Sequence, residues 1–326
     1  MEIDAGLVVK RMTFSANGEY LVSGHYEGVR VWRVQDGREM ANLEKVGNDE
    51  HLALSKDGNW LATGTTGNRS YWGEVIVWDA NTYKQKYQWN KRLVYGLDFS
   101  PDATQLVAVS ADKAIIWDLA TGNEVRTLVH QGWVKAVKYS PEGDRIATVT
   151  RNHVRVWDSE DGRLLHEIQV SCSGEVSLVW GYNLLFIMSK DKVQKIEGTT
   201  VSEWSIPETD ETSLCTGTAL QSRGEFVVSA TSRTIGFWDI STYAQLPPIR
   251  HSQDIESITL SPDDQFIAIA GKDRKITIKR LSHISVSIVP SCISTSSLCS
   301  CFCLRVAFLS MSLNTSHFLG TNHPDR

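Results

Sequence analysis

The chain has 326 residues and a formal net charge of −5, with 33 Lys and Arg residues against 38 Asp and Glu residues. Because no run of Lys or Arg exceeds two residues, we expect no nucleic-acid partner bound through its phosphates. The acidic start Met1–Asp4 lacks the layout of a signal peptide, and only Cys172 and Cys215 precede residue 282, so cytoplasmic residence is expected, with nuclear residence as the alternative.

The dipeptide Trp-Asp recurs on a regular grid along the chain. It stands at residues 78–79, 117–118, 157–158 and 238–239, so the successive steps are 39, 40 and 81 residues. Trp32 lies 46 residues before the first of these sites, and Ile196 and Lys279 occupy the two remaining positions of the grid. Self-similarity at a fixed period of about 40 residues predicts an array of similar supersecondary units.

A second marker, a four-residue turn, runs in phase with the first. The turns are rich in Ser, Pro, Asp, Asn and Gly, and in chain order they occupy residues 15–18, 55–58, 100–103, 140–143 and 261–264. Residues 180–183 and 221–224 fill the two gaps in this series. Seven units are therefore expected, over roughly residues 7–281.

Each unit is predicted to consist of strands. In the fourth unit, short apolar or alternating segments occupy residues 134–139, 145–150, 154–157 and 163–168, with turns between them. One four-stranded sheet has exposed edges and cannot bury its apolar surface alone, whereas seven sheets arranged radially bury each against the next. The predicted fold is all-β, a seven-bladed β-propeller of four-stranded antiparallel sheets.

In these two markers the chain resembles the WD-repeat β-propeller family, over residues 7–281. The resemblance implies that each Trp ends the third strand of a blade, wedged between neighbouring blades, and that the following Asp accepts backbone N–H groups of the next turn. The positions expected to carry these structural roles are Trp32, Trp78, Asp79, Trp117, Asp118, Trp157, Asp158, Trp238 and Asp239.

The chain departs from the family pattern in its buried polar residues. Well-formed blades of the family join a His, a strand Ser or Thr, an Asp and the Trp by hydrogen bonds, and no unit here has the full set. His130 is paired with Asn152 where Asp is expected, and His251 and Asp273 share a unit whose Trp position is Lys279. We therefore expect apolar packing to dominate, and the first, fifth and seventh blades to be the least stable.

The domain boundary is expected near residue 290. Residues 1–290 form the propeller, closed either by residues before Leu7 or by Ile284–Val289 as the last outer strand, and residues 291–326 form a Ser- and Cys-rich tail. We expect the tail to be disordered or non-native. A transmembrane anchor would be too short there, and a metal or lipid site on Cys299, Cys301 and Cys303 lacks further ligands.

The sequence contains no motif for catalysis, cofactor binding or metal binding that we recognise. We therefore expect no cofactor and no enzyme activity, and predict a non-catalytic protein–protein interaction scaffold or adaptor without stable membrane insertion. Two alternatives remain: a regulatory or sensor propeller module of a larger signalling assembly, and a propeller hydrolase whose carboxylates and His converge at the central channel.

The candidate binding residues lie on loops that resemble the partner-binding face of the family. An insertion in the second unit carries Arg69, Tyr71 and Trp72, residue types enriched at binding hot spots, although they could merely cover the edge of their own blade. Trp133, Arg151 and Arg233 lie on other loops of this face, together with Lys113, Lys190, Lys272 and Arg274 against Asp112, Asp191 and Asp273. Such a basic and aromatic face favours proteins or peptides that are acidic or phosphorylated.

Overall fold

The computed structural model describes residues 1–44, 49–65, 72–174, 176–181, 184–189, 192–205, 215–220, 226–239, 242 and 244–281. The chain divides into two compact units, Met1–Ser285 and Val286–Arg326. The described residues all belong to the first unit, so the predicted tail 291–326 lies outside them. They form strands and no helix, and so include no helix that could cross a membrane.

Seven antiparallel sheets of four strands each make up the described part of the chain. Blade 1 consists of β2 (Val9–Phe14), β3 (Tyr20–His25), β4 (Gly28–Arg33) and β5 (Glu39–Glu44). Blade 2 consists of β6 (Asp49–Leu54), β7 (Trp60–Thr65), β8 (Trp72–Asp79) and β9 (Gln85–Arg92). Blade 3 consists of β10 (Val94–Phe99), β11 (Gln105–Ser110), β12 (Lys113–Asp118) and β13 (Glu124–Val129). Blade 4 consists of β14 (Ala136–Tyr139), β15 (Arg145–Val149), β16 (His153–Asp158) and β17 (Leu164–Gln169). Blade 5 consists of β18 (Ser177–Gly181), β19 (Leu184–Met188), β20 (Lys192–Glu197) and β21 (Thr200–Ser205).

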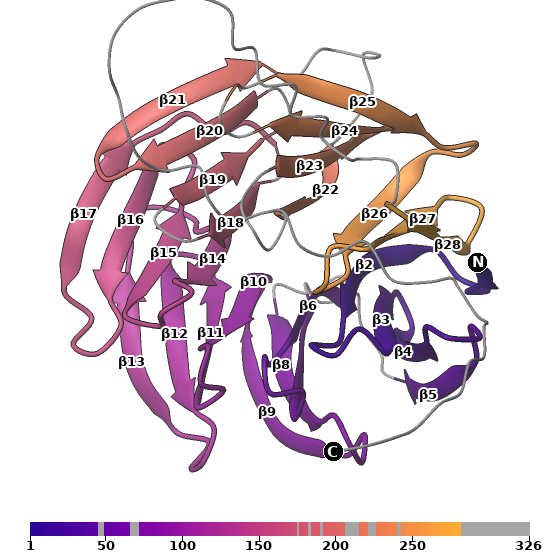
Figure 1. The fold of residues 1–326 in the computed structure, drawn as a ribbon. Helices are drawn as coiled ribbons and strands as arrows, with labels where there is room; N and C mark the ends of the chain where they lie inside the picture. Colours follow the sequence, from indigo (N-terminus) through magenta and orange to yellow (C-terminus); the bar gives the residue numbers. More distant parts are fainter. Residues whose placement is uncertain are drawn as a thin grey trace, which may run out of the picture. The chain divides into compact units, whose positions relative to one another are not determined.

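Blade 6 consists of β22 (Cys215–Leu220), β23 (Phe226–Thr231), β24 (Thr234–Asp239) and β25 (Gln245–Arg250). Blade 7 takes three strands from the end of the described chain and one from its start: β26 (Ile255–Leu260), β27 (Phe266–Gly271), β28 (Lys275–Arg280) and β1 (Glu2–Asp4). Each innermost strand packs against that of the next blade, and β26 packs against β2 to close the ring (Figure 1). The predicted seven-bladed propeller is confirmed.

The N-terminal strand completes the last blade. β1 pairs antiparallel with β28, with Ile3 opposite Ile276. The N-terminal amino group of Met1 donates to the carbonyl oxygen of Ile278 at 3.0 Å, and the Ile278 N–H donates back to the Met1 carbonyl at 2.9 Å. Of the two predicted ways to close the ring, the described residues therefore show the N-terminal one, while Ile284–Val289 lies outside them.

The hydrophobic core lies between adjacent blades. Between blades 2 and 3, for example, Val77 of β8 belongs to one buried cluster with Leu106 of β11 and Trp117 of β12. Between blades 7 and 1, Ile276 packs in one cluster with Trp32. In these clusters the facing sheets of adjacent blades contribute apolar side chains. The ring therefore buries apolar surface that a single sheet would expose to solvent.

In four blades the Trp at the end of the third strand coincides with a break in the strand register, whereas in blade 6 the break lies between Ile235 and Phe237, before Trp238. The pairing between the third and fourth strands shifts at Trp32, Trp78, Trp117 and Trp157. In blade 5, whose equivalent residue is Ile196, the pairing of β20 with β21 runs without a shift. After Trp117, Asp118 Oδ1 accepts the Thr121 N–H at 2.8 Å, and the hairpin then turns through a left-handed glycine.

Four of the described blades carry part of the polar network of the family. In blades 2 and 6 the described residues include only the Trp bond, from Trp78 to Thr63 Oγ1 at 3.3 Å and from Trp238 to Ser229 Oγ at 3.1 Å, whereas blades 4 and 1 add a histidine. In blade 4 the Trp157 Nε1–H donates to Thr148 Oγ1 at 2.9 Å, and His130 Nε2 lies 2.8 Å from the same oxygen. In blade 1 the Trp32 Nε1–H donates to Ser23 Oγ at 2.7 Å. Here the histidine is His25, at the end of the second strand, and its Nε2 lies 2.8 Å from Ser23 Oγ.

Blade 1 therefore has a buried polar connection that the sequence pattern did not reveal. His25 Nδ1 is buried and has no hydrogen-bond partner among the described residues, so this network is only partly satisfied. The lower stability of blades 1, 5 and 7 stays a prediction.

Candidate functional site

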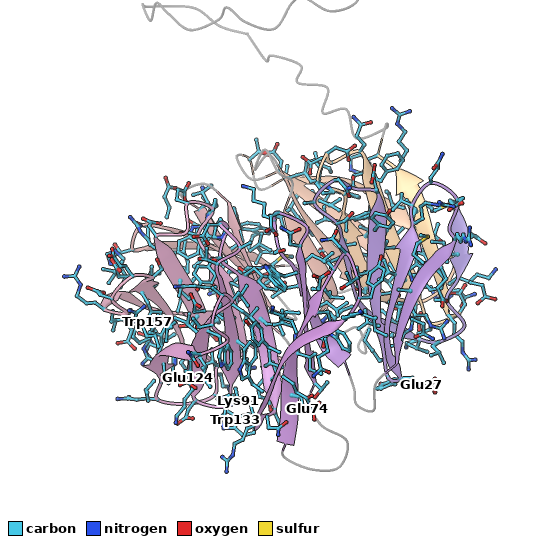
Figure 2. The ribbon with its side chains drawn as sticks, turned by 90° about the horizontal axis from the view of Figure 1, so that it is seen from below. Glu27, Glu74, Lys91, Glu124, Trp133 and Trp157 are labelled. Carbon is cyan, nitrogen blue, oxygen red and sulfur yellow. The ribbon has the colours of Figure 1, made fainter. Side chains whose placement is uncertain are left out.

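Two sets of loops form one face of the propeller, which we call the loop face: the loops that link consecutive blades and the turns that join the second and third strands of each blade. Backbone hydrogen bonds tie the two sets together. The Val134 N–H donates to the Ala111 carbonyl at 2.7 Å, the Cys172 N–H to Arg151 at 3.0 Å and the Ile255 N–H to Ser232 at 2.6 Å. Figure 2 shows two of the loop residues, Glu27 and Trp133, along the lower side of the propeller. The loop face is thus built on fixed backbone.

One hollow on the loop face, which we call the blade-4 groove, lies over blade 4. Its volume is about 780 Å³. Three loops surround it, contributing Gln131–Trp133 with Lys135, Thr150–His153, and Cys172–Gly174. Arg155 of β16 and Glu167 of β17 complete the lining. Two of the predicted binding residues, Trp133 and Arg151, therefore line the same groove.

Trp133 is exposed although it is a large aromatic residue. It has 59% of its surface accessible, and its ring lies 5.6 Å from that of Tyr95 at an interplanar angle of 37°. The preceding Gly132 adopts a φ of +116°, which side chains rarely tolerate, and an added Cβ there would meet no atom within 4 Å. The loop therefore presents Trp133 beside open space instead of folding it into the core.

Arg155 is a buried cation at the groove. Its side chain is 9% exposed, and its Nη2 lies 2.6 Å from Glu167 Oε1. The strand register fixes this pair, because Arg155 stands opposite Glu167 on one side and Thr148 on the other. The Nη1 atom is buried and, among the described residues, has no hydrogen-bond partner. A buried donor left unpaired costs free energy, so the guanidinium is only partly satisfied.

The groove has an excess of positive charge. Among the residues that line it, Lys135, Arg151 and Arg155 are cationic and Glu167 is the carboxylate. Lys135 Nζ donates to the Gly174 carbonyl at 2.6 Å, which holds this ammonium group at the wall between blades 4 and 5. The arrangement can offer several charged donors to one anion.

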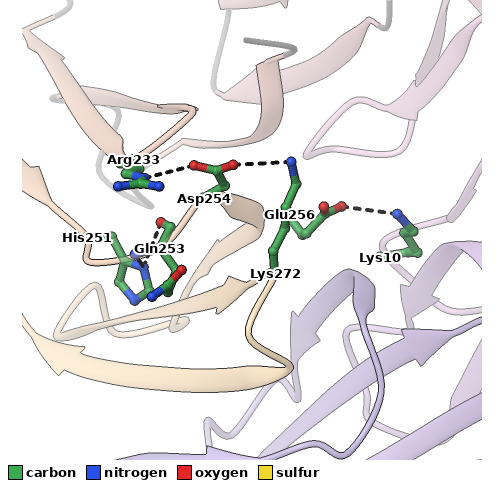
Figure 3. A network of polar contacts seen from close by, with 7 residues as sticks. All are labelled: Lys10, Arg233, His251, Gln253, Asp254, Glu256 and Lys272. Atoms are coloured by element: carbon green, nitrogen blue, oxygen red, sulfur yellow. Dashed lines mark hydrogen bonds and ion pairs between the residues drawn. The ribbon is translucent and has the colours of Figure 1, made fainter. Parts of the chain in front are cut away.

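Near blades 6 and 7 the basic residues of the loop face are paired with an acid. Asp254 Oδ1 accepts from Arg233 Nε at 2.9 Å, and Asp254 Oδ2 accepts from Lys272 Nζ at 3.2 Å (Figure 3). Hydrogen bonds from Arg233 and then from Lys272 hold the pKa of Asp254 below its usual value. Arg233 is therefore a less available cation than the sequence suggests, because the ion pair with Asp254 already neutralises part of its charge.

Several predicted binding residues are outside the described part of the chain. Arg69 and Tyr71 of the insertion lie there, and Trp72 begins β8 without a described side chain. Lys190 and Asp191 lie there as well. Their role stays a prediction.

One exposed aromatic residue of the loop face, Tyr26, is not among the binding residues predicted from the sequence. Tyr26, in the turn between β3 and β4, has 48% of its surface accessible, and Lys10 Nζ lies 5.1 Å from its ring centroid. The signal was present, because residues between the second and third strands of every unit fall on this face. Among the described residues no three His, Cys, Asp or Glu side chains come together as metal ligands.

Comparison with known proteins adds to the geometry of the blades. The profile of the WD domain, G-beta repeat, matches residues 82–118, 122–158 and 246–278. The first two matches end at the Trp-Asp dipeptides of blades 3 and 4. The chain belongs to the WD40-repeat β-propeller family. The third match ends at Ile278, directly before Lys279, where other WD40 units have Trp.

Curated proteins similar to this WD40 chain include two of different length. The chain is 30% identical over 164 residues to apoptotic protease-activating factor 1 of Rattus norvegicus. This match covers 48% of the chain and 13% of that protein. The chain is 26% identical over 197 residues to the serine-threonine kinase receptor-associated protein of Homo sapiens. This match covers 57% of the chain and 54% of that protein. The chain thus matches about half, or less, of the length of these relatives.

Solved structures share the WD40-type fold at low sequence identity. The β-propeller domain of Myceliophteria thermophila Cps50 (Swd1) superposes with a TM-score of 0.73 at 18% identity, covering 83% of this chain and 96% of that domain. Hydrazine synthase of Kuenenia stuttgartiensis superposes with a TM-score of 0.74 at 14% identity, covering 84% and 96%. Since the latter is an enzyme by name, the propeller fold alone does not decide whether a chain is catalytic.

Proposed function

We propose that this WD40 chain is a non-catalytic scaffold or adaptor that binds a partner protein on its loop face, with Trp133 as the central contact. The exposure of Trp133 at the rim of the blade-4 groove carries this proposal. Large aromatic residues contribute strongly to binding when a partner buries them, and exposed ones mark interaction surfaces. The name of one relative, the serine-threonine kinase receptor-associated protein, agrees with a role in association.

The proposal includes points that rest on the sequence. The insertion residues Arg69, Tyr71 and Trp72 are proposed to extend the contact surface, Arg151 and Arg233 to favour acidic or phosphorylated segments, and the chain to act in the cytoplasm without a cofactor. Residues 1–290 are proposed to be the functional propeller.

Affinity capture with the full chain tests the proposal. Trp133→Ala should remove one or more captured proteins, because it deletes the exposed ring without disturbing a buried contact. Leu164→Ala is the matched control, since Leu164 is also apolar and 40% exposed but lies on β17, the outer strand of blade 4. An identical set of captured proteins for Trp133→Ala and for the parent chain would contradict the proposal.

A second function, a regulatory module of a larger assembly, is supported by one observation. The match to apoptotic protease-activating factor 1 covers only 13% of that protein, so a similar propeller segment occurs within a much longer chain. Measuring the mass of the native complex would distinguish the two, because a module should be recovered in a stable assembly and an adaptor in exchangeable complexes.

A further inference from the structure

We propose that the blade-4 groove binds the phosphoryl group of a phosphorylated serine or threonine in a partner peptide, and that Glu167 competes with this group for Arg155. The inference rests on the proposed function, and it adds the chemistry of the ligand and a built-in competitor.

The charge of the groove fits a dianion. Lys135, Arg151 and Arg155 leave a net charge of two positive after Glu167 is counted. A phosphoryl group on serine or threonine carries about −1.5 to −2 at neutral pH, whereas an Asp or Glu side chain carries half as much. The oxygen atoms of a phosphoryl group can also accept from several of these donors at once.

Arg155 is held in place before any ligand arrives. It projects from the middle of a strand, is 9% exposed, and is oriented by the cross-strand neighbour Glu167. A guanidinium fixed in this way loses little side-chain entropy on binding. Its buried Nη1 has no partner among the described residues, so an oxygen that reaches it would satisfy a donor that is unpaired in the structure described here.

Glu167 is suited to act as the competitor. It occupies Nη2 of Arg155 at 2.6 Å, but its own side chain is 41% exposed and can turn toward solvent. A phosphoryl oxygen would take its place on Nη2. The binding free energy should therefore reflect the difference between the interaction of Arg155 with the phosphoryl group and its interaction with Glu167. Replacing Glu167 with a neutral side chain of the same size should therefore increase the affinity for the ligand.

The surroundings of the groove favour a peptide. Its volume of about 780 Å³ exceeds that of one phosphoryl group, so neighbouring residues of the ligand can also enter. Trp133 offers an exposed aromatic ring for an apolar residue beside the phosphorylated one. A long polyanion is disfavoured, because the chain is acidic overall and the basic residues Arg233 and Lys272 elsewhere on the loop face are paired with Asp254.

Binding of synthetic peptide libraries to the full chain tests the inference. The probes are three libraries of short peptides that differ only at the central residue, which is phosphoserine or phosphothreonine, the unmodified residue, or glutamate. We expect retention of the phosphorylated library alone, and weaker retention at high salt. Equal retention of the unmodified library, or of the glutamate library, would overturn the inference.

Variants of the groove sharpen the test. Arg151→Gln and Lys135→Gln should each lower the affinity for the selected phosphopeptide about tenfold or more, since each removes a charge-assisted donor. Glu167→Gln should raise it several-fold, because the amide still accepts from Arg155 without competing as an anion. Arg145→Gln is the matched control in the same blade: Arg145 pairs with Asp144 at 3.3 Å at the opposite end of β15 and should leave the affinity unchanged.

The outcomes separate this inference from the proposed function. If Glu167→Gln lowers the affinity while its circular dichroism matches the parent, the competitor role is wrong. If Glu167→Gln does not fold, the two cation variants still decide whether the groove is the site, and unchanged affinity in both overturns the inference. If Trp133→Ala loses a protein partner but no phosphopeptide binds, the scaffold function survives and the phosphoryl site is rejected.

Discussion

The fourth residue of several turns adopts a left-handed backbone conformation, which is favourable for glycine and strained for other residues. In the turn series at the second marker, the fourth residue adopts a left-handed φ: +72° at Gly18, +76° at Gly58 and +58° at Ala103. A side chain with a Cβ is strained in this region, whereas glycine is not. The serine that begins each turn fixes it, as Ser100 Oγ does by accepting the Gln105 N–H at 2.9 Å.

We therefore predict opposite effects for two turn substitutions. Gly58→Ala should lower the free energy of unfolding by about 1 kcal/mol, because the added Cβ meets nothing within 4 Å and only the backbone strain remains. Ala103→Gly should raise it by about 0.5 kcal/mol, since relief of strain is partly offset by the greater entropy of the unfolded chain. Urea unfolding measures both, and a change of the same sign in the two variants would count against the strain argument.

Two buried histidines make stability depend on pH. Burial lowers the pKa of His25 to about 4, with a smaller contribution from Arg30, and burial and then Arg155 lower the pKa of His130 to about 4. The unfolded histidine titrates near 6.5. Below that pH the unfolded chain binds protons that the folded chain does not, so stability is fully present above pH 6.5 and is lost as the pH falls to 4.

The expected loss is on the order of 3 kcal/mol for each of these histidines between pH 6.5 and 4. His130→Gln should flatten the pH dependence, because the amide can still contact Thr148 but does not titrate. Asp112 opposes the shift at His130, so Asp112→Asn should steepen the dependence slightly. Urea midpoints measured across this pH range test the claim, and an unchanged slope in His130→Gln would rule out His130 as a contributor.

At the scale of the elements, the third strand supplies a buried tryptophan in blades 1, 3, 4 and 6. Trp117 at the end of β12 is 1% exposed and stacks on Trp89 of the neighbouring blade at 4.7 Å, with an interplanar angle of 18°. Lys91 Nζ lies 5.3 Å from the Trp117 ring and 3.3 Å from Glu124, so one cation joins both contacts. The blade interface thus rests on an aromatic stack contributed by two strands.

Two tryptophan variants should separate the core from the surface. Trp117→Ala should lower the free energy of unfolding by about 3–5 kcal/mol, because it removes a buried aromatic side chain and leaves a cavity. Trp133→Ala should lower it by less than about 1 kcal/mol, since Trp133 is 59% exposed. Chemical unfolding checks both values. A large loss in Trp133→Ala would mean that the ring is structural and would weaken its use as a binding variant.

At the scale of the whole propeller, the short strand β1 adds to the packing of β26 against β2 in closing the ring. β1 joins a segment from the start of the chain to β28 near the end of the described residues, and Ile3 is 4% exposed in the cluster between blades 7 and 1. A contact between such distant segments is formed only when the intervening blades have folded. The stability of the ring is therefore coupled to this short strand.

Ile3→Asp should open this closure. A carboxylate in the buried cluster would destabilise the pairing of β1 with β28 and lower the free energy of unfolding by about 3 kcal/mol or more. Glu2→Gln is the control on the same strand, because the Glu2 side chain is 65% exposed and 3.5 Å from Lys275. Limited proteolysis should cut Ile3→Asp faster at blade 7, and equal cutting of the two variants would show that β1 is dispensable.

The sequence by itself determined the fold, because the Trp-Asp grid and the turn series repeat with one period and each unit can bury its surface only against a neighbour. It also indicated Trp133 and Arg151, since their positions in the repeat assign them to the loop face. Tertiary structure decided the closure by β1, the hydrogen bond from Trp32 of β4 to Ser23 of β3, the neutralisation of Arg233 by Asp254 and the groove around Arg155. These features join residues from different blades or different strands, and a repeat pattern specifies what each unit forms but not which side chains meet between units.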